Sequence, residues 1–484
     1  MNPDTSTEPS LLIGGRERQG RGRLIEGRNP ATGEPTHRLA GASREDVALA
    51  VRTAREAMQE ASWAALLPHQ RAAILHRISD AIAADAGRFA DLQMRDNGKV
   101  RAECLAQARS AAATFRYFAG ACETMESSLT PSRGDYLSMS VHEPYGVVAA
   151  LTPWNSPLTM EAQKVAPALA AGNAVILKPS ELTPSAALAL GRVALEAGLP
   201  PGILNVLAGW GDETGAALVE HPGVDMVSFT GGTATGRRIA QVAAGKLMHV
   251  ALELGGKSPH IVFADADLEA AVRAVADGIF EGSGQSCVAG SRLFVQRAAL
   301  TQVRDAVVAR ARALRMDLPD ADGAQMGPLA SFDHRARVEW MVAQAREEGA
   351  TILAGGRRPD QSRLSQGAFY EPTVIGDIDN RSRIAQEEIF GPVLCVLAFD
   401  DEDDLVAQAN DSDLGLAAGI WCRDFAKAWR VARRLQAGTV WINTYKQLSI
   451  ATPFGGFKQS GLGREKGLSG IRLYQQAKGI YIGL

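Results

Sequence analysis

The chain has no excess of charge of either sign and no long run of basic residues. Its 484 residues include 51 Lys and Arg against 54 Asp and Glu, which gives a formal net charge of −3. Binding to nucleic acid or to an anionic membrane surface depends on clustered basic residues. We therefore expect neither nucleic acid nor a membrane as a partner, and the composition favours a small molecule.

Long apolar runs are also absent. A membrane-spanning helix needs about 20 consecutive apolar residues, whereas apolar runs such as residues 147–151 and 174–177 are far shorter. Residues 1–10 are polar and carry Asp4 and Glu8, without the basic and apolar regions of a secretory signal. The sequence therefore predicts a soluble, cytoplasmic protein.

Cysteine is scarce and scattered. The chain has five cysteines with no CxxC pair and no Cys/His cluster at metal-ligand spacing. Such thiol usage is typical of a reducing compartment, and the simplest interpretation of each is a small buried hydrophobic residue. No metal site is predicted. The cysteines are Cys104, Cys122, Cys287, Cys395 and Cys422.

A chain of 484 residues is too long for one compact core and suggests two or three domains of about 150 residues each. From residue 145, short β-branched apolar runs alternate with longer helical patterns bounded by Gly and Pro, which predicts βαβ units with a parallel, doubly wound sheet. The expected strands are residues 146–151, 174–177, 204–207, 226–229 and 250–254.

The helical patterns have recognisable ends. One helix is expected over residues 185–197, with Thr183 as N-cap, Pro184 at the first helical position and Gly198 past its end. Upstream of the sheet, Ser43 and Asp46 resemble a capping box that opens a helix over 43–61. Further helices are expected over 70–92 and 101–118.

The alternation restarts after Gly256 and predicts a second α/β unit. It consists of a helix from residue 268, a strand at 293–295, a helix at 298–315, a strand at 351–354 and an apolar run at 393–399. Residues 136–143 and 479–484 fit neither unit and alternate as half-exposed strands do. They are expected to pair with each other or with a neighbouring subunit.

One cysteine differs from the other four in its surroundings. Cys287 ends the segment Gly282-Ser-Gly-Gln-Ser-Cys287, a polar loop with two glycines directly after a helical run. A reactive cysteine needs an exposed sulfur, an environment that favours thiolate and donors for the oxyanion that it generates. From this segment alone two interpretations stay open, a nucleophile and a loop that only ends a helix.

Two polar residues stand at the ends of expected strands, where parallel sheets hold their functional sites. Glu253 is a lone acid in an apolar run that ends in Gly255 and Gly256, and Asn155 follows the run 146–151. For each residue a purely structural role also stays open. Glu253 could accept hydrogen bonds from backbone amides, and Asn155 could be a turn residue.

The cofactor signals are Lys178 and Glu181 after one expected strand, and Phe229-Thr-Gly231-Gly232-Thr-Ala-Thr-Gly236 after another. A glycine-rich turn that opens a helix directly after a strand lets backbone amides approach a pyrophosphate. This segment is not GxGxxG, so alone it is a weak dinucleotide signal.

Six segments together resemble the aldehyde dehydrogenase superfamily, from about residue 27 to the C-terminus and in the family's order. They are Pro153-Trp-Asn155, Phe229-Thr-Gly231-Gly232 with Gly236, Glu253-Leu-Gly-Gly-Lys257, Gly284-Gln-Ser-Cys287, Glu387-Glu388-Ile-Phe390-Gly-Pro392, and Pro453-Phe454-Gly-Gly-Phe457-Lys458 with Gly463-Arg464-Glu465.

The resemblance implies an NAD(P)+-dependent, non-acylating aldehyde dehydrogenase. By it, Cys287 attacks the aldehyde carbonyl, and the Asn155 amide and the Cys287 backbone N–H hold the oxyanion of the thiohemiacetal. Hydride transfer then leaves a thioester, which is hydrolysed by water that Glu253 activates. Lys257 and Glu465 are expected at the catalytic centre or along a proton path.

The resemblance also assigns binding residues. For the cofactor, with NAD preferred and NADP possible, these are Trp154, Lys178, Glu181, Gly231, Gly232, Gly236, Leu254, Glu388 and Phe390. For the substrate aldehyde they are Ser156, Met160, Gln163, Ser286, Val288, Lys446, Leu448 and Phe454.

The sequence departs from the family's pattern at the two binding sites. Gly232 stands where many members have a serine, and Ser156 and Gln163 stand where several members have aromatic residues. A polar wall favours a polar or carboxylate-bearing aldehyde, such as a semialdehyde or a hydroxylated aromatic aldehyde, over a long alkanal. Lys446 is expected either to hold an anionic group at the entrance or to point to solvent.

The implied fold has a Rossmann-like dinucleotide-binding domain (residues 1–125 and 145–255) and a second α/β catalytic domain (256–459). A small β oligomerisation element and C-terminal tail (126–144 and 460–484) complete it, in a homodimer or homotetramer. Two alternatives remain: an acylating enzyme that passes the thioester to coenzyme A, and a crystallin-like structural protein. The presence of Glu253 argues against the first, and the full set of Cys287, Asn155 and Glu253 against the second.

Overall fold

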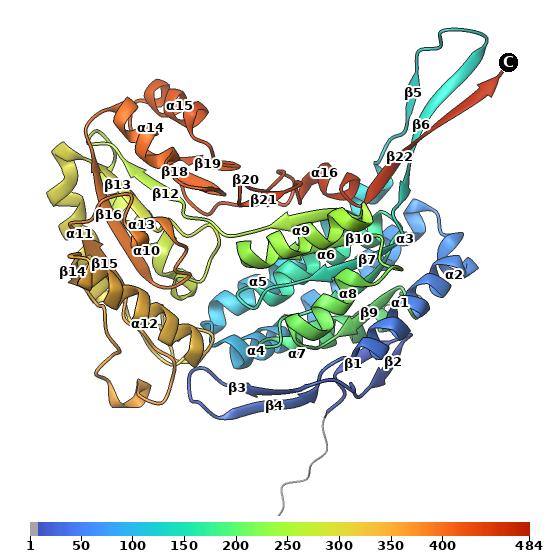
Figure 1. Cartoon of the computed structure of the whole chain (residues 1–484), viewed down its shortest axis with the longest axis horizontal. Helices are drawn as coiled ribbons and strands as arrows, with labels where there is room; N and C mark the ends of the chain where they lie inside the picture. The colour runs from blue at the N-terminus through green and yellow to red at the C-terminus, as the bar shows by residue number, and fades with distance from the viewer. Residues whose placement is uncertain (1–7) are drawn as a thin grey trace, which may run out of the picture.

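The computed structural model describes residues 8–484 of the chain. The protein forms two large sheets flanked by helices, and a narrow arm projects beside the first sheet (Figure 1). This arrangement confirms the predicted α/β fold class with parallel sheets. Residues 1–7, which include most of the N-terminal stretch considered for a signal and the start of the predicted first domain, lie outside the described residues.

Five parallel strands form the centre of the eight-stranded sheet, whose order is β2-β1-β9-β8-β7-β10-β11-β21. The five apolar runs predicted as parallel strands are thereby confirmed. The strands are β1 (Leu11–Ile13), β2 (Arg16–Arg18), β7 (Val147–Leu151), β8 (Ala174–Lys178), β9 (Leu204–Leu207), β10 (Met226–Thr230), β11 (His249–Glu253) and β21 (Gly461–Leu462).

The strand order reverses direction at β7. The chain passes from β7 to β8 and β9 on one side, then returns to β10 and β11 on the other. Open parallel sheets bind ligands in the crevice at such a switch point, beyond the carboxyl ends of the strands. The loops that follow β7 and β10 are therefore the expected place for a ligand.

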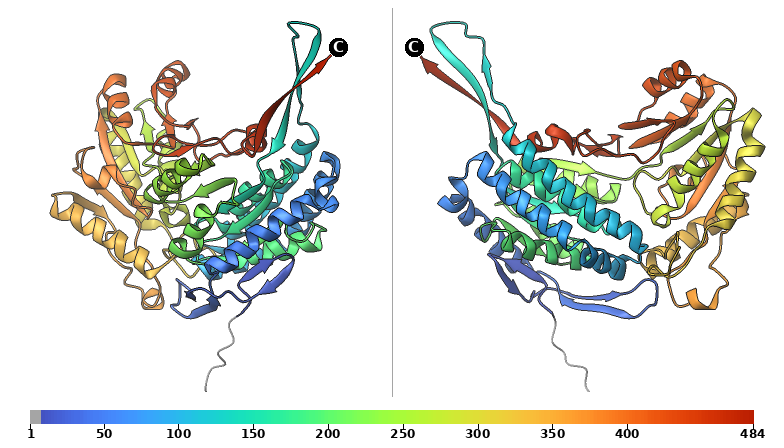
Figure 2. Two further views of the ribbon diagram at one scale, coloured as in Figure 1. Left: turned by 45° about the vertical axis from the view of Figure 1, so that its right-hand side comes forward. Right: turned by 180° about the vertical axis from the view of Figure 1, so that it is seen from behind.

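Helices cover both faces of this sheet, which is why β7, β8 and β9 are buried along their whole length. Seen from behind, the blue and cyan helices α3 and α5 run side by side across the back (Figure 2). The helices are α1 (Arg44–Gln59), α2 (Ala61–Ala64), α3 (Pro68–Ala84), α4 (Ala86–Asn97), α5 (Arg101–Glu123), α6 (Pro157–Ala170), α7 (Pro184–Glu196), η1 (Gly211–Gly215), α8 (Ala216–Glu220) and α9 (Thr233–Lys246).

The predicted helix ends are mostly confirmed. Ser43 caps α1 in a capping box with Asp46, and α7 begins at Pro184 and is followed by Gly198 at φ +89°. The expected single helix over 70–92 is wrong, because the chain leaves helical geometry at Asp85 (φ −108°, ψ 23°), which ends α3 and begins α4. A break there lets each helix bury its own apolar face.

The second sheet has seven strands in the order β14-β15-β16-β13-β12-β18-β19. Three of them were predicted, and β12, β15, β18 and β19 were missed, although none of them is shorter than the predicted β14. The strands are β12 (Pro259–Val262), β13 (Arg292–Gln296), β14 (Thr351–Ala354), β15 (Thr373–Gly376), β16 (Val393–Phe399), β18 (Ala417–Trp421) and β19 (Thr439–Ile442).

Helices also flank the second sheet. The predicted helices from residue 268 and over 298–315 are present as α10 and α11. The helices of this part are α10 (Leu268–Phe280), η2 (Glu281–Gly284), η3 (Arg297–Ala299), α11 (Leu300–Ala313), α12 (Phe332–Glu347), η4 (Ser362–Leu364), α13 (Arg383–Gln386), α14 (Glu402–Asn410) and α15 (Phe425–Arg434).

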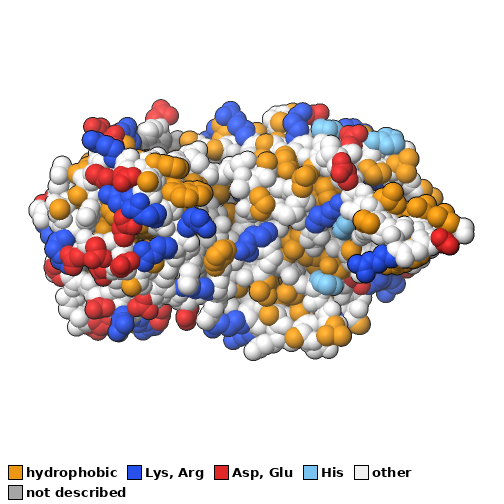
Figure 3. Space-filling model, turned by 90° about the horizontal axis from the view of Figure 1, so that it is seen from above, with side chains coloured by type: hydrophobic (Ala, Val, Ile, Leu, Met, Phe, Trp, Pro, Cys, Tyr) orange, Lys and Arg blue, Asp and Glu red, His pale blue; other side chains and the backbone are white. Residues whose placement is uncertain are grey.

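The arm is a three-stranded antiparallel sheet of β5 (Ser128–Thr130), β6 (Tyr136–Pro144) and β22 (Gln475–Gly483). The prediction that the two half-exposed segments pair with each other is confirmed, since Tyr481 lies opposite Ser138. Hydrophobic side chains gather on the arm, at the right of the view from above (Figure 3). The exposed ones are Leu129, Leu137, Ile480, Tyr481, Ile482 and Leu484.

The C-terminal segment joins the two sheets before it enters the arm. Strand β20 (Phe457–Lys458) pairs with β17 (Leu414–Gly415), and β21 then adds to the edge of the first sheet, where Gly461 lies opposite Glu253. Helix α16 (Gly467–Arg472) leads on to β22.

A separate two-stranded ribbon of β3 (Leu24–Arg28) and β4 (Pro35–Ala40) was not predicted. Within residues 8–484, no helix is long and apolar enough to cross a membrane.

Candidate active site

Cys287 lies in a loop whose backbone is bent by three consecutive residues with positive φ. After α10 the chain passes through Gly282 (φ +62°), Ser283 (φ +56°) and Gly284 (φ +70°). A Cβ atom on Gly284 would lie 2.1 Å from the carbonyl oxygen of Gly391, so a side chain is excluded there. The two glycines noted in the sequence therefore permit the bend that turns the chain from α10 toward Cys287.

Asn155 is attached directly to this loop. Its side-chain amide donates a hydrogen bond of 2.9 Å to the carbonyl oxygen of Gln285, two residues before Cys287. The Gln285 side chain is itself fixed, since its amide donates to the Gly282 carbonyl and its oxygen accepts from the Ala330 N–H. The loop after β7 and the loop of Cys287 are thus brought together, as the switch point of the sheet predicts.

Glu253 is the last residue of β11 and is buried, with 6% of its surface exposed. Neither carboxylate oxygen has a hydrogen-bond partner within the described protein. Burial and the neighbouring Glu465 carboxylate raise the pKa of Glu253 well above its usual range. The structural alternative, an acid satisfied by backbone amides, does not describe this residue.

The glycine pair after Glu253 allows two close approaches. A Cβ atom on Gly256 would lie 2.4 Å from the Cys287 carbonyl oxygen, and one on Gly255 would lie 2.2 Å from Glu388 Oε2. The Gly256 N–H donates to Glu388 Oε1 at 3.0 Å. Only glycine at both positions lets the cysteine loop, the strand end and Glu388 come together.

The thiol of Cys287 is only partly exposed. Burial, with the Glu388 and Glu253 carboxylates, raises the pKa of Cys287 to about 12, and Lys466 opposes that shift. The sulfur is therefore protonated at neutral pH in the structure without ligand, and it needs a proton acceptor before it can act as a nucleophile.

A buried ion pair lies beneath Glu253 and was not found from the sequence. Lys164 Nζ contacts Glu465 Oε1 at 2.6 Å, with 0% and 3% of the two side chains exposed. Lys164 also donates to the Ser228 hydroxyl (3.1 Å), which is 2.9 Å from the Tyr474 hydroxyl. A lysine on the buried helix α6, which also carries the buried Glu161 and Gln163, was the available signal.

Lys257 is buried, and burial is the main cause that lowers the pKa of its ammonium group to about 8. Its charged neighbours are Cys395, Arg292, Glu388 and Glu387. Lys257 lines a small pocket together with Asn410 and Gly415. Of the two residues predicted for a proton path, Glu465 therefore lies beside Glu253, whereas Lys257 faces the second sheet.

The predicted dinucleotide residues gather around the ends of β8, β10 and β11. Lys178 Nζ lies 3.4 Å from Glu181 Oε2, and burial lowers the pKa of Lys178. The Gly231 N–H donates to the Glu253 carbonyl, and Gly232 is the N-cap of α9. Nothing lies within 4 Å of a Cβ position on Gly232, so the start of α9 is open.

Four further residues predicted to bind the cofactor take part in close packing. A Cβ atom on Gly236 would lie 2.5 Å from Leu254 Cδ2, so α9 approaches β11 closely at this point. Trp154 and Phe390 meet edge to face at 5.2 Å, and the Phe390 carbonyl lies 2.7 Å from His334 Nε2. Phe390, Glu388 and Ser286 line one common cavity beside the Cys287 loop.

The predicted substrate residues differ in their surroundings. Val288 and Phe454 are buried in an apolar cluster that Cys287 packs against, together with Trp441 and Tyr445. Ser156 accepts a hydrogen bond of 3.1 Å from the Gln107 side chain, and Gln163 is buried. Met160 is half-buried and Leu448 is exposed.

Lys446 does not point freely to solvent. Its ammonium group lies 3.7 Å from Glu281 Oε2 and donates to the Asp277 carbonyl at 3.4 Å, and 19% of its side chain is exposed. Glu281, together with Lys99 and Glu103 nearby, was not found from the sequence. The entrance therefore carries an ion pair where the sequence suggested an unpaired cation.

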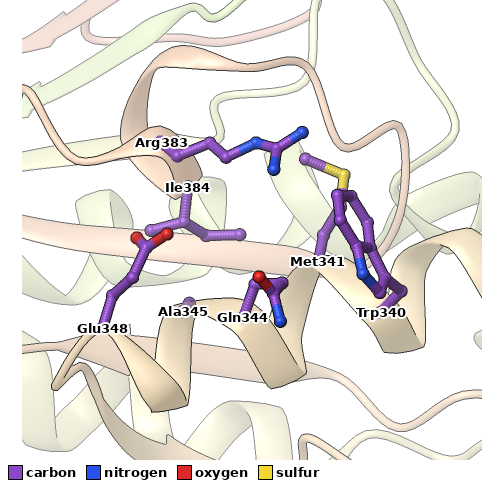
Figure 4. A pocket seen from close by; sticks show the side chains of 7 residues that line it. All are labelled: Trp340, Met341, Gln344, Ala345, Glu348, Arg383 and Ile384. Carbon is purple, nitrogen blue, oxygen red and sulfur yellow. The ribbon is translucent and has the colours of Figure 1, made fainter.

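A further pocket on the outer side of the second sheet contains none of the predicted site residues (Figure 4). The Arg383 guanidinium covers the Trp340 ring at 4.6 Å from its centroid. The residues that line this pocket are Trp340, Met341, Gln344, Ala345, Glu348, Arg383 and Ile384. No cluster of three or more His, Cys, Asp or Glu at metal-binding distance occurs within the part of the chain that the structure describes.

Comparison with known proteins identifies the family. The profile of the aldehyde dehydrogenase family matches residues 16–480. A betaine aldehyde dehydrogenase of Bacillus subtilis (strain 168) is 41% identical over 454 residues, which cover 94% of this chain and 93% of the relative. One of Rhizobium leguminosarum bv. trifolii (strain WSM2304) is 42% identical over 465 residues, which cover 96% and 94%.

Solved structures agree with this family. An aldehyde dehydrogenase mutant from Bacillus cereus has a TM-score of 0.96 at 40% identity, covering 98% of this chain and 96% of that one. A betaine aldehyde dehydrogenase mutant from Staphylococcus aureus, in complex with NAD+ and with a BME-modified cysteine, has a TM-score of 0.97 at 38% identity, covering 99% and 98%.

The buried ion pair beneath Glu253 gives a test that needs no substrate. Lys164→Met should lower the free energy of unfolding by about 3 kcal/mol or more, because it leaves the Glu465 carboxylate buried without its cation. Calorimetry at a fixed scan rate should show a clearly lower midpoint. Lys427→Met, which removes a more exposed partner of Asp265, should cost about 1 kcal/mol or less. Equal midpoints for the two variants would contradict this account.

Proposed function

The chain belongs to the aldehyde dehydrogenase family, and we propose that it oxidises an aldehyde to the carboxylic acid with NAD+, through a thioester on Cys287. The observation that carries this proposal is the meeting of three groups from separate segments around the Cys287 loop. Asn155 is hydrogen-bonded to the backbone of the Cys287 loop, and the unpaired Glu253 carboxyl is close enough to influence the thiol. These are the nucleophile, oxyanion donor and base that acyl transfer from an aldehyde needs.

The residues at the switch point fit a dinucleotide. The start of α9 is open at Gly232 and presents backbone amides, which suits a pyrophosphate, and Glu181 is partly exposed for ribose hydroxyls. Glu388 and Phe390 share a cavity with Ser286 beside Cys287. Solved relatives from Staphylococcus aureus and Bacillus cereus are NAD+ complexes. When bound, NAD+ would accept the hydride.

The first chemical step is attack of the Cys287 sulfur on the aldehyde carbonyl carbon. The raised pKa of Cys287 means that its proton must leave during this step, and the Glu253 carboxylate is the adjacent acceptor. The oxyanion that forms is held by the Asn155 amide and by the Cys287 backbone N–H. When this oxyanion collapses, the carbon loses hydride and becomes the carbonyl carbon of a thioester.

Glu253 then acts on water. After the proton taken from Cys287 has passed to solvent, the Glu253 carboxylate takes a proton from a water molecule that attacks the thioester. The carbon–sulfur bond breaks, the sulfur recovers a proton from Glu253, and the acid leaves. A carboxylate with a raised pKa is a stronger base than an exposed one, which favours this role near neutral pH. The Lys164 ammonium beside Glu465 limits the negative charge that would accumulate around Glu253. This assignment makes the enzyme non-acylating, since water rather than coenzyme A accepts the acyl group.

The substrate is proposed to be a polar aldehyde. Ser156, Gln163 and the Lys446–Glu281 pair offer hydrogen bonds at the mouth, where an alkyl chain would leave them unsatisfied. Relatives named betaine aldehyde dehydrogenase act on a quaternary ammonium compound, which aromatic faces recognise well. Of the proposed substrate residues only Phe454 is aromatic, and the Lys466 ammonium already lies 5.2 Å from its ring centroid.

The assembly and location are also proposals. The exposed apolar residues of the arm favour a homodimer or homotetramer, because such a surface is usually covered by a partner. Light scattering on the full chain would give its mass, and a monomer would contradict this. All five cysteines are free, which agrees with a reducing cytoplasm. Fractionation of the host cell would test the location.

The nucleophile and the base can be tested separately. Cys287→Ala should reduce oxidation on the order of 10³-fold or more while NAD+ binding stays intact. Glu253→Gln should slow turnover on the order of a hundredfold without a burst of NADH, because in this mechanism Glu253 also accepts the Cys287 proton before hydride transfer. In the parent, kcat should fall with decreasing pH from a higher pH than for an exposed carboxylate, since Glu253 must be ionised and its pKa is raised. Glu253→Gln should lose that dependence.

Three outcomes would contradict this mechanism. Substantial turnover in Cys287→Ala would show that Cys287 is not the nucleophile, and an unchanged rate in Glu253→Gln would show that Glu253 is not the base. A requirement for coenzyme A in product formation would make the enzyme acylating.

Cofactor preference depends on Glu181 in this proposal. Its carboxylate should repel a 2′-phosphate, so NAD+ is preferred, and Lys178 at 3.4 Å offsets part of that repulsion. Glu181→Gln should raise kcat/KM for NADP+ relative to NAD+ by about tenfold. Glu196→Gln, an exposed residue at the end of α7, is the control and should change nothing. A parent enzyme that prefers NADP+ would contradict the role of Glu181.

The mouth is tested with three aldehydes of equal length: a semialdehyde, an alkanal and betaine aldehyde. The semialdehyde should have the highest kcat/KM, and Lys446→Met should reduce its advantage by roughly tenfold, the value of one charge-assisted hydrogen bond. Glu281→Gln should increase that advantage because it frees Lys446. Lys427→Met is the control. If the ratio of kcat/KM for the semialdehyde to that for the alkanal were equal in the parent and in all three variants, Lys446 would have no role in anion recognition. If the parent preferred the alkanal, the proposal of a polar mouth would be wrong.

A further inference from the structure

Tyr445 lies directly behind the Cys287 loop and has no part in the mechanism above. It follows β19 in the chain and is buried, with 6% of its surface exposed. Its hydroxyl donates a hydrogen bond of 2.9 Å to the carbonyl oxygen of Val288, the residue after Cys287. This contact joins the far edge of the second sheet to the backbone of the proposed nucleophile.

The Tyr445 ring is held on two sides by aromatic residues. It stacks on the buried His260 ring, with centroids 4.1 Å apart and planes inclined by 15°, and it contacts Trp441 at 4.8 Å. His260 is fixed in turn, because the Trp421 indole N–H donates to its Nε2 at 3.0 Å. The ring therefore has little freedom to carry its hydroxyl away from Val288.

Three glycines make room for this stack. A Cβ atom on Gly419 would lie 2.4 Å from Tyr445 Cδ2, and one on Gly278 would lie 3.0 Å from Cδ1. One on Gly290 would lie 3.1 Å from the hydroxyl and 2.8 Å from His260 Nδ1. These glycines come from β18, from α10 and from the Cys287 loop itself, so the slot is built from separate elements.

Cys287 thus lies between two fixed carbonyl groups. Asn155 holds the Gln285 carbonyl before it and Tyr445 holds the Val288 carbonyl after it, while the Ala289 N–H closes a turn onto Ser286. The Val288 carbonyl and the Ala289 N–H belong to one planar peptide unit, and the Ser286 carbonyl and the Cys287 N–H belong to another, so these contacts together restrict the direction of the Cys287 N–H. That N–H is the backbone donor to the oxyanion in the proposed mechanism.

The hydrogen bond does not change over the working range of pH. Burial raises the pKa of the Tyr445 hydroxyl, so it stays a donor, and burial lowers the pKa of His260 to about 3, so the stacked ring stays neutral. Of the titratable groups near the stack, the Lys446 ammonium lowers the pKa of His260, and the Cys287 thiol, which is itself protonated at neutral pH, faces Tyr445. The Trp421 N–H requires His260 Nε2 to be the acceptor.

We propose that Tyr445 is a positioning residue, which holds the Val288 carbonyl so that the Cys287 backbone N–H is directed at the developing oxyanion. This inference rests on the proposed function, since it assumes that Cys287 is the nucleophile. The role is worth testing because misplacement of a reacting group by about 1 Å can cost on the order of a hundredfold in rate.

The test is Tyr445→Phe, which keeps the ring and removes only the hydroxyl. Hydride transfer, followed as the rate of the first NADH turnover, should slow on the order of tenfold, with KM for NAD+ unchanged. An aldehyde with deuterium on the carbonyl carbon should show a larger isotope effect on kcat than in the parent. A loss of folding stability alone would not move that isotope effect.

Tyr370→Phe is the matched control, because Tyr370 is an equally buried tyrosine of the second part of the chain. It should leave the first-turnover rate and the isotope effect at parent values. Gly290→Ala is the second variant. It should slow the first turnover and increase the isotope effect, as Tyr445→Phe does, because the new Cβ would displace the Tyr445 hydroxyl. This variant keeps the inference testable if Tyr445→Phe folds poorly.

The outcomes separate this inference from the proposed function. If Cys287→Ala is inactive and both Tyr445→Phe and Gly290→Ala match Tyr370→Phe, then Tyr445 has no positioning role. If Cys287→Ala retains turnover, the proposed function fails and this inference with it. Slower hydride transfer and a larger isotope effect in Tyr445→Phe and Gly290→Ala, with an inactive Cys287→Ala, support both.

Discussion

The close approach of two backbone segments at Gly255 and Gly256 is the constraint on which the site depends. These glycines connect β11 of the first sheet to β12 of the second, and their missing side chains admit the Glu388 carboxylate and the Cys287 carbonyl. The base at Glu253 and the proposed nucleophile are therefore brought together by the connection between the two sheets. A movement of one sheet against the other would separate them.

Burial at this connection sets the protonation of the site. Cys287 and Glu253 both have raised pKa values, so in the structure without ligand the thiol holds its proton and the carboxyl readily takes one. The Glu465 carboxylate would raise the pKa of Glu253 further if it were not paired with Lys164. The ion pair is costly to bury, and its Lys164 ammonium opposes the rise in the pKa of the proposed base Glu253.

Much of the fold and the centre of the site were predictable because their signals are local. Five apolar runs separated by helical patterns identified the first sheet, and a polar residue at a strand end identified Glu253 and Asn155. Strand β18 of the second sheet was missed although it is as long as the predicted β13. The helices α14 and α15 on either side of it were not recognised, so the alternation that marked the first sheet was lacking. The contacts of Lys164 and Tyr445 were missed for a different reason, since their partners lie 301 and 157 residues away in the chain.

Substrate choice is the property that family membership determines least, because it depends on a few side chains at the mouth. A cation is attracted to the face of an aromatic ring, and at this mouth the ring of Phe454 is already covered by Lys466. A carboxylate is attracted to Lys446, but Glu281 competes for the same ammonium. Because Lys466 covers the Phe454 ring, binding of a cationic aldehyde is disfavoured, and because Glu281 competes for Lys446, binding of a carboxylate is weakened. The aldehydes that remain favoured carry neutral hydrogen-bonding groups, or a carboxylate that displaces Glu281. If the proposed substrate residues line the mouth, the balance between Lys446 and Glu281 is the physical quantity on which the preferred aldehyde depends.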